Sequence, residues 1–320
     1  MLSGIRKEDK NLFLLTPSPV LPGGRYSLFL QKFNQKIFTS SVRKAINKLH
    51  FSSPLIWNMA PYYSGTGFRL NHSLTVYDCV DEIVGERGRK TEVIRTLEEE
   101  ALKESDLIFT TSQYLYKSRK NFNPRTFLVP NGSDFKYFQR LLMEGSKDLP
   151  DLDNFPLPRI GYSGTLDDRI DLDLIKFLAE SKPSWAFIII GISHVNIENL
   201  LDLPNIHFLG FKSPSLLPHY LSKLSLGILP YHITKATRAI HPVKAYDYLS
   251  VGLPIVSTPL PECGYFHEII KVADSRKEFL SRMEEALRMD NPEAHRLRMR
   301  FSRDNSWDNR MEMIQNEIEE

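Results

Sequence analysis

A lysine and an aspartate three residues apart, Lys244 and Asp247, lie in a stretch that predicts a loop, an amphipathic helix, a turn and a buried strand. The first turn of a helix offers free backbone N–H groups and the positive end of the helix dipole, and a lysine there adds its ammonium to the same anion site. An acid three residues later lies on the same helical face. The pair could therefore hold a diphosphate with Lys244 and a sugar hydroxyl with Asp247, although a surface helix with an i,i+3 ion pair fits equally.

Six more residues suited to binding a nucleotide follow predicted strands in the same half of the chain: Gly164, Thr165, Arg169, Gly191, Phe211 and Tyr231. The carboxyl ends of parallel strands share one sheet edge, and ligands bind there. A glycine lets a ligand approach the backbone, and an arginine can grip a phosphate with two hydrogen bonds. The backbone beside Phe211 could pair with a nucleobase edge, and the ring of Tyr231 could lie over the same cleft. Each turn alone fits an ordinary connection, but together with Lys244 they predict a nucleoside diphosphate pocket.

Two aspartates beyond a predicted strand at residues 74–77, Asp78 and Asp81, are candidates for a catalytic base that takes a proton from a hydroxyl. We favour Asp81 because it lies further into the loop, while turn or capping roles fit both acids. Two Asp-x-Asp pairs, at residues 151–153 and 171–173, have the letters of a metal site. The first lies in a predicted linker and the second opens a predicted helix, so we predict no metal ligands.

The elements that would position these residues alternate between strand-like and helix-like runs, which indicates parallel α/β architecture. In the first half we predict strands at residues 12–15, 55–58, 74–77, 107–111 and 126–129, and helices near 27–50, 91–104 and 112–121. In the second half we predict strands at residues 159–163, 186–190, 206–209, 226–229 and 255–257, and helices at 169–180, 214–223, 243–251, 275–288, 294–302 and 307–319. Residues 141–157 are rich in Asp, Pro and Leu without a clear period, and we interpret them as a linker.

The composition is that of a globular protein with two domains, since the chain has 320 residues, of which 42% are hydrophobic and 25% charged. The longest apolar runs are too short to cross a bilayer, and the first residues lack the apolar core of a secretion signal. Two cysteines, Cys79 and Cys263, are too few for a disulfide framework or a metal cluster, which favours a cytoplasmic location. We expect no nucleic-acid partner.

The net charge is unevenly distributed. Residues 1–70 hold ten Lys or Arg against two acidic residues, a balance of +8, so the rest of the chain carries −6 of the total of +2. Within that segment, residues 28–51 predict a helix with basic residues among recurring apolar ones, namely Phe29, Phe33, Ile37, Val42, Ile46 and Leu49. A basic amphipathic helix can lie on an anionic membrane, here the inner face of the plasma membrane. A domain helix with a solvated charged face fits equally.

Four motifs in this order along the chain resemble those of GT-B glycosyltransferases of the retaining type, and especially bacterial enzymes of surface and capsular polysaccharide synthesis. They are YDCVDE at residues 77–82, VPNGSD at 129–134, PRIGYSGT at 158–165 and the helix of Lys244. The resemblance covers roughly residues 55–310. It implies two Rossmann-like domains facing a cleft, and transfer of a sugar from a nucleotide-sugar donor, of UDP or GDP type, to a saccharide or lipid-linked acceptor. Neither a metal nor another cofactor is implied.

The resemblance places Gly164 and Arg169 beside the donor phosphates and Lys244 on the diphosphate. It also divides the chain into an N-terminal acceptor-side domain at residues 1–140, the linker at 141–157, a donor-binding domain at 158–302, and a helix at 303–320 that returns to the first domain. Asp247 stands where the family has the second glutamate of its Glu-x7-Glu motif, and the first glutamate is replaced by Ala239. Whether the enzyme retains or inverts the sugar configuration stays open.

A second departure lies at the start of the chain. The family opens with a strand, a loop and a helix before the point that residues 12–15 resemble, so we expect the N-terminal domain to lack its first βαβ unit. Either the reading frame begins at an internal Met or the protein is a shortened homologue. A catalytically silent homologue that binds nucleotide or a partner, and a GT-B-like nucleotide-sugar epimerase, are the alternative functions.

Overall fold

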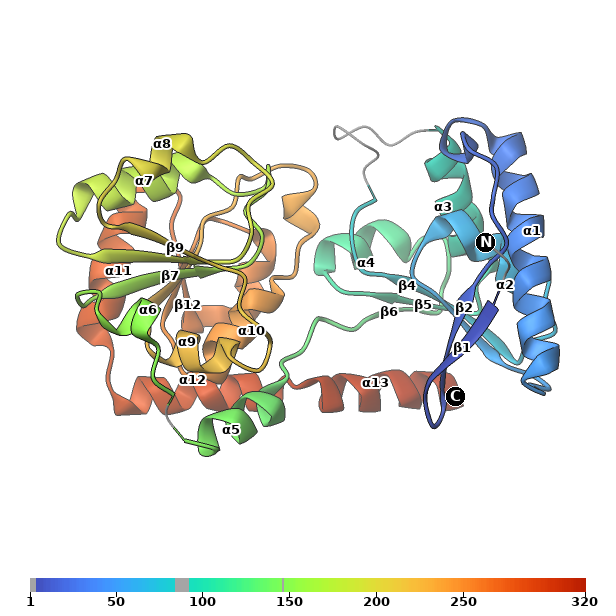
Figure 1. Ribbon diagram of the computed structural model, residues 1–320. Helices are drawn as coiled ribbons and strands as arrows, with labels where there is room; N and C mark the ends of the chain where they lie inside the picture. The colour runs from blue at the N-terminus through green and yellow to red at the C-terminus, as the bar shows by residue number, and fades with distance from the viewer. Residues whose placement is uncertain (1–3, 84–91, 146) are drawn as a thin grey trace. The chain divides into compact units, whose positions relative to one another are not determined.

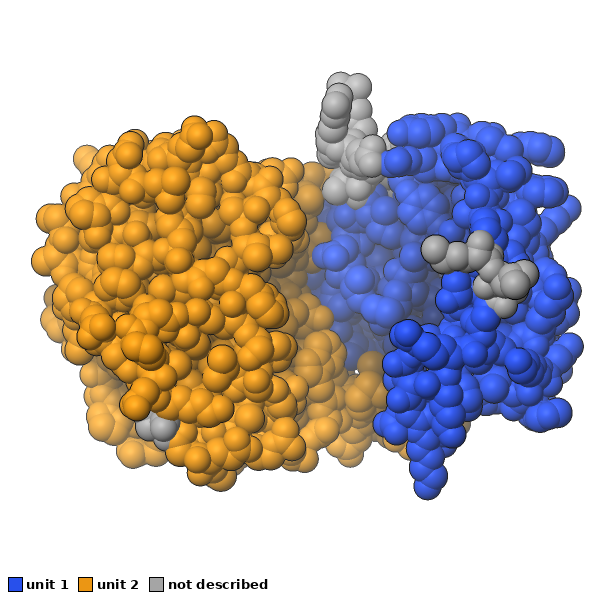
Figure 2. Space-filling model, viewed as in Figure 1, with its two compact units in different colours: residues 1–129 blue, residues 130–320 orange. Residues whose placement is uncertain are grey.

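Two compact α/β units make up the chain, residues 1–129 and 130–320 (Figure 2). The computed structural model describes residues 4–83, 92–145 and 147–320, with the side chains of residues 267 and 268 left out. The boundary between the units falls before the predicted one at residue 140. Each unit has its own parallel sheet.

Unit 2 is a doubly wound sheet of six parallel strands in the order β12-β11-β10-β7-β8-β9 (Figure 1). The strands are β7 (Arg159–Ser163), β8 (Ala186–Ile190), β9 (Ile206–Gly210), β10 (Leu226–Leu229), β11 (Ile255–Ser257) and β12 (Ile270–Val272). The helices are α5 (Phe135–Met143), α6 (Pro150–Asp153), α7 (Leu172–Ser181), α8 (Glu198–Leu201), α9 (Leu217–Ser222), α10 (Val243–Ser250), α11 (Arg276–Met289), α12 (Pro292–Asp304) and α13 (Trp307–Glu319). The predicted strands of this half are confirmed, whereas β12 and α5 were missed.

The strand order of unit 2 reverses between β7 and β10. From β7 the chain proceeds outward through β8 to β9, and it then returns to place β10 on the other side of β7. Helices α7 and α11 pack together on one side of the sheet, while α5, α9, α10 and α12 contact one another on the other side (Figure 1). A crevice forms beyond the carboxyl ends of strands at such a switch point, which is where doubly wound proteins bind ligands. The fold therefore directs attention to the loops after β7 and β10.

Unit 1 holds a parallel sheet of four strands in the order β3-β4-β5-β6 and a separate antiparallel hairpin. Its elements are β1 (Gly4–Asp9), β2 (Leu12–Thr16), α1 (Leu28–Lys48), β3 (Leu55–Asn58), α2 (Ser64–Gly67), β4 (Leu74–Cys79), α3 (Glu92–Glu104), β5 (Leu107–Thr110), α4 (Gln113–Arg119) and β6 (Thr126–Leu128). The predicted strand at residues 12–15 is confirmed, but it is not a buried strand of the parallel sheet. This segment is β2 of the hairpin, in which Leu12 and Leu14 are exposed.

Helix α1 of unit 1 buries a polar face, whereas the recurring apolar residues of this segment are exposed or half-buried. Its buried residues are Gln31, Asn34, Gln35, Thr39, Ser41 and Ala45. The amides of Gln31 and Gln35 donate to the carbonyl of Tyr62 at 2.7 and 3.0 Å. Asn34 both donates to and accepts from the backbone of Leu21, at 2.8 Å each way. The helix amides thus satisfy backbone groups of neighbouring loops that would otherwise be buried without partners.

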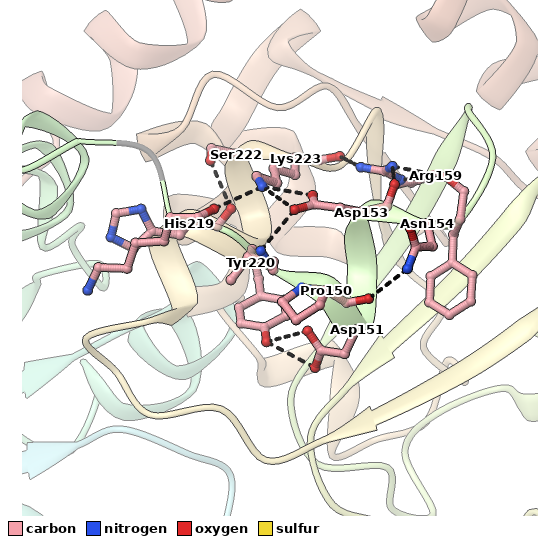
Figure 3. Close-up of polar contacts among 12 residues, drawn as sticks. Pro150, Asp151, Asp153, Asn154, Arg159, His219, Tyr220, Ser222 and Lys223 are labelled. Carbon is pink, nitrogen blue, oxygen red and sulfur yellow. Dashed lines mark hydrogen bonds and ion pairs between the residues drawn. The ribbon is translucent and has the colours of Figure 1, made fainter.

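The segment predicted as a linker, residues 141–157, lies inside unit 2. Leu149 and Leu152 join the hydrophobic core of that unit. Around them, a polar network binds α6 to α9 and β7, as Figure 3 shows. Asp153 pairs with Lys223 at 2.7 Å, and its carbonyl accepts from Arg159 at 2.9 Å. The segment belongs to unit 2 because two leucines three residues apart pack on the core of that unit.

In the part of the chain that the structure describes, no helix is both long and apolar enough to cross a membrane. Cys79 and Cys263 are buried free thiols.

Candidate functional site

The loop that follows β7 is tied to both neighbouring loops at the switch point. On one side Leu166 N–H donates to the Ile192 carbonyl at 2.9 Å, and His194 N–H donates back to Leu166 at 2.8 Å. On the other side His232 N–H donates to the Arg169 carbonyl at 2.8 Å. Backbone hydrogen bonds therefore fix residues 164–171 between the loops after β8 and β10.

Two glycines allow this close approach of loops. Gly191 has φ 141° and Gly164 has φ 139°, a region that side chains rarely adopt. A Cβ on Gly191 would lie 2.1 Å from the Gly164 carbonyl oxygen, and one on Gly164 would lie 2.3 Å from Cε of Lys244. Gly191 thus makes room for the neighbouring loop, and Gly164 makes room for the Lys244 side chain.

Lys244 lies in the first turn of α10 with its ammonium between two tyrosines. Its Nζ donates to the hydroxyl of Tyr231 at 3.2 Å and lies 5.6 and 5.7 Å from the ring centroids of Tyr162 and Tyr231. Such cation–π contacts hold an ammonium without neutralising it. Among the described residues no carboxylate lies within ion-pair distance of Lys244, so its charge is available to an anion.

Arg169 lies in the same cluster and is paired. Its guanidinium binds the Asp167 carboxylate with Nε at 3.0 and 3.1 Å and Nη2 at 2.6 Å. Burial alone would raise the pKa of Asp167, but the hydrogen bonds and charge of Arg169, with the charge of Lys244, lower it below its usual range. The charges of Arg169 and Lys244 therefore both act on the Asp167 carboxylate.

Asp247 is the acidic partner predicted for Lys244. Burial raises its pKa to about 7, Lys244 opposes this rise, and the charge of Asp134 adds to it. Among the residues that the structure describes, Asp247 has no hydrogen-bond or ion-pair partner. A half-buried carboxyl without a partner beside a cation is suited to accept a hydrogen bond from a ligand hydroxyl.

The loop of the VPNGSD motif supports the entry to α10. Asn131 donates to the carbonyl of His241 at 2.8 Å, and the ring of His241 contacts the Tyr246 hydroxyl at 2.9 Å. Gly132 packs so tightly that a Cβ would lie 2.8 Å from the backbone nitrogen of Trp307. The Asn131 side chain therefore anchors the backbone that leads into the helix of Lys244.

The remaining donor-side candidates are spread along the sheet edge. The Thr165 carbonyl accepts from the Tyr162 hydroxyl at 2.8 Å, and Phe211 follows β9 with 72% of its surface exposed. The Tyr231 ring is buried against Lys244. Beside it, a cavity of about 270 Å³ is lined by residues that include Asp171, Tyr231, His232, Thr258, Arg276 and Phe279.

Sequence reasoning missed Asp167 and Tyr162 as members of this cluster. Asp167 stands two residues before Arg169 in the predicted turn, so its charge was visible in the sequence. Tyr162 is the residue before the last of β7, and its inward orientation depends on the strand register. Only the fold brings its ring to Lys244.

The two candidate bases belong to unit 1. Strand β4 extends to Cys79, so Asp78 lies in the strand rather than beyond it. Asp78 accepts from the indole Nε1 of Trp57 at 3.0 Å, and burial raises its pKa. Asp81 is exposed and follows the strand, next to Glu82, which pairs with buried Arg119 at 2.9 Å. Asp78 is thus half-buried with a raised pKa, whereas Asp81, the residue favoured from sequence, is exposed.

Both Asp-x-Asp pairs have structural partners. Asp151 pairs with Lys212. Asp151 also accepts from the Tyr220 hydroxyl, and Asp153 pairs with Lys223, as Figure 3 shows. Asp171 caps α7 by accepting from Leu174 N–H at 2.8 Å. These acids stabilise the fold of unit 2.

Known proteins are similar to unit 2 and to the chain as a whole. The family model "Glycosyl transferases group 1" matches residues 158–288, which include Lys244 and Arg169. A Bacillus subtilis protein named as a teichuronic acid biosynthesis glycosyltransferase, TuaH, is 25% identical over 357 residues, covering 94% of this chain and 87% of the relative.

Solved structures show the same fold at low identity. A UDP-forming trehalose-phosphate synthase from Burkholderia xenovorans is 12% identical with a TM-score of 0.76, covering 100% of this chain and 90% of that one. HepE from Anabaena, in complex with UDP, is 13% identical with a TM-score of 0.68, covering 90% and 84%. Fold, family match and relative together define a glycosyltransferase of the GT-B fold. The chain has this fold, and its residues 158–288 resemble the group 1 family.

Proposed function

We propose that the protein transfers a sugar from a nucleoside diphosphate sugar, of UDP or GDP type, to a saccharide or lipid-linked acceptor in surface polysaccharide biosynthesis. The observation that carries this proposal is the Lys244 and Arg169 cluster at the switch point of unit 2. The name of TuaH supports the pathway class, and the UDP complex of HepE supports the donor class.

The chemistry follows from where charge develops. As the bond between sugar and diphosphate breaks, negative charge grows on the leaving group, and fixed cations stabilise it. The Lys244 ammonium, the Arg169 guanidinium and the free N–H groups at the start of α10 would supply that stabilisation. We therefore propose that the reaction needs no metal ion, so a chelator should leave the rate of transfer unchanged.

Binding of the donor nucleotide is the first test. Lys244→Met keeps the apolar stem between the two tyrosines but removes the charge. Since a hydrogen bond to a charged group contributes about 1.5–3 kcal/mol, we expect about 10- to 100-fold weaker binding of UDP or GDP by calorimetry. Lys176→Met, which removes an exposed lysine from α7, is the matched control. Equal affinities in wild type and Lys244→Met would refute the pocket.

For an inverting reaction, a carboxylate of unit 1 would take the proton of the acceptor hydroxyl. We propose Asp78 or Asp81 for this role. The raised pKa of Asp78 supports the first. Asp78→Asn should lower kcat about 10²- to 10⁴-fold if Asp78 is the general base, with donor affinity unchanged. The same result in Asp81→Asn, with an active Asp78→Asn, would assign the role to Asp81.

We also propose that α1 contacts the anionic inner face of the plasma membrane, where a lipid-linked acceptor would be found. Exposed apolar side chains gather at its start, namely Tyr26, Leu28, Phe29 and Phe33, with Phe29 79% exposed. The exposed cations Arg25, Lys36 and Lys44 accompany them. Apolar anchors among cations are the features that bind anionic interfaces.

Vesicle co-sedimentation tests this surface. Wild type should bind phosphatidylglycerol-containing vesicles at low salt and release them at high salt. Phe29→Ser with Phe33→Ser should weaken binding, whereas Met143→Ser, a change at an exposed residue of α5, should not. Binding that is indifferent to lipid charge and salt would contradict the proposal.

A further inference from the structure

The Asp167 carboxylate is hydrogen-bonded to the guanidinium of Arg169. The proposed donor site would use the same guanidinium to bind a phosphate. Arg169 directs both Nε and Nη2 to this one side chain, in the two-pronged geometry that an arginine also uses for a phosphate. The carboxylate is half-buried, and the charge of Lys244 reaches it as well. An internal anion is therefore bound to one of the two cations that would bind the diphosphate, and the charge of the other cation also acts on it.

The loop keeps its path without this carboxylate. The backbone bonds of Leu166 and Arg169 to the adjacent loops hold residues 164–171 in place. The cap of α7 is supplied by Asp171. The one local bond that the carboxylate accepts from the backbone comes from Arg169 N–H at 3.0 Å, and an asparagine oxygen could accept it equally well. The bidentate pairing with Arg169 is thus not needed to shape the turn.

We propose that Asp167 is an internal counter-ion of the diphosphate site, bound to Arg169 in the empty enzyme and displaced from it by the incoming diphosphate. This inference rests on the proposed donor site. The pairing affects both the affinity for the diphosphate and the rate of product release. The carboxylate offsets part of the attraction of Lys244 and Arg169, and it recaptures Arg169 as the nucleoside diphosphate product leaves. Asp167 is accordingly a positioning residue that limits product affinity.

The test compares two variants in which the charge of one of two neighbouring aspartates is removed. Asp167→Asn removes the counter-ion and keeps the side-chain size, and Asp168→Asn makes the same charge change at the next residue, which is exposed. With inorganic pyrophosphate and with UDP as probes in calorimetry, we expect Asp167→Asn to bind about 3- to 10-fold more tightly than wild type at low salt. The gain should shrink at high salt, and Asp168→Asn should match wild type. In steady state, inhibition by UDP should strengthen in Asp167→Asn.

The outcomes separate this inference from the proposed function. If UDP binds wild type and Asp167→Asn equally, or Asp167→Asn more weakly, the counter-ion role is overturned and the donor site stands. If pyrophosphate binding rises in Asp167→Asn while neither UDP nor GDP binds any form, the counter-ion role stands and the donor assignment fails.

A double-mutant cycle tests whether Asp167 weakens diphosphate binding through its pairing with Arg169. In an Arg169→Met background, Asp167→Asn should gain less affinity for pyrophosphate than it does in wild type, because the pairing is already lost. An undiminished gain would overturn the role assigned to Arg169.

Discussion

The two units of this chain differ in how they use polar side chains. Unit 2 concentrates charged residues at one end of its sheet, where Lys244, Arg169 and Asp167 meet over two close-packed glycines. Unit 1 places polar residues inside, in the buried face of α1 and in the Glu82, Arg119 and Glu98 cluster. Buried polar residues thus hold the fold of unit 1 together, whereas unit 2 also gathers polar residues into the candidate ligand site.

The largest effect that this comparison predicts belongs to unit 1. Arg119 binds Glu82 at 2.9 Å and Glu98 at 2.8 Å, and all three are buried. Arg119→Met would remove the guanidinium that binds these two buried carboxylates, which costs about 3–5 kcal/mol in the free energy of unfolding. Urea denaturation would measure the loss, with Arg125→Met as control. A change below about 1 kcal/mol would show that the cluster is not structural.

The next effect belongs to the loops of unit 2. Gly191→Ala would force a Cβ to within 2.1 Å of a backbone oxygen, whereas Gly210→Ala, also at positive φ, meets nothing within 4 Å. We expect Gly191→Ala to lower the free energy of unfolding by about 2–4 kcal/mol and Gly210→Ala by about 1 kcal/mol. Similar melting temperatures for the two variants would mean that the loops do not pack as described.

How far the sequence could predict this molecule follows the same division. The strands of unit 2 were predictable because they are short apolar runs, buried on both faces and followed by turn residues, as in residues 186–190. The turns of Gly164 and Gly191 were predicted, and both glycines follow the carboxyl ends of their strands. Asp167 and Tyr162 became visible only once strand register and loop packing were known. Helix α1 was predicted, but its buried polar face was not, because the apolar period alone does not tell which face packs on the domain.

A smaller effect sharpens that contrast within α1. Asn34 is 2% exposed and bonds twice to the Leu21 backbone, while Phe33 is 45% exposed. We expect Asn34→Ala to cost about 1–3 kcal/mol, since it leaves buried backbone groups without partners, and Phe33→Ala to cost under about 0.5 kcal/mol. Thermal melts of the two variants would check this. A larger loss of stability in Phe33→Ala would mean that α1 packs on its unit through its apolar face and not its polar face.

The smallest effect concerns pH. Because the folded pKa of Asp247 is raised from 3.8 to about 7, the folded protein holds its proton more tightly than the unfolded chain. Stability therefore falls as pH rises between these values, and Asp247→Asn removes that slope. The charge that appears above pH 7, near Lys244 and Asp134, should weaken UDP binding about 2- to 5-fold in wild type relative to Asp247→Asn. Calorimetry at roughly pH 6 and pH 8 would reveal it, and parallel curves for the two proteins would exclude Asp247 as the titrating group.

A crystal structure of the protein with UDP bound tests the central claim most directly. We predict diphosphate oxygens within about 3 Å of both the Lys244 ammonium and the Arg169 guanidinium, with the Asp167 carboxylate moved off Arg169. A nucleotide bound away from the carboxyl ends of β7 and β10, or one that leaves both cations without a phosphate contact, would contradict it.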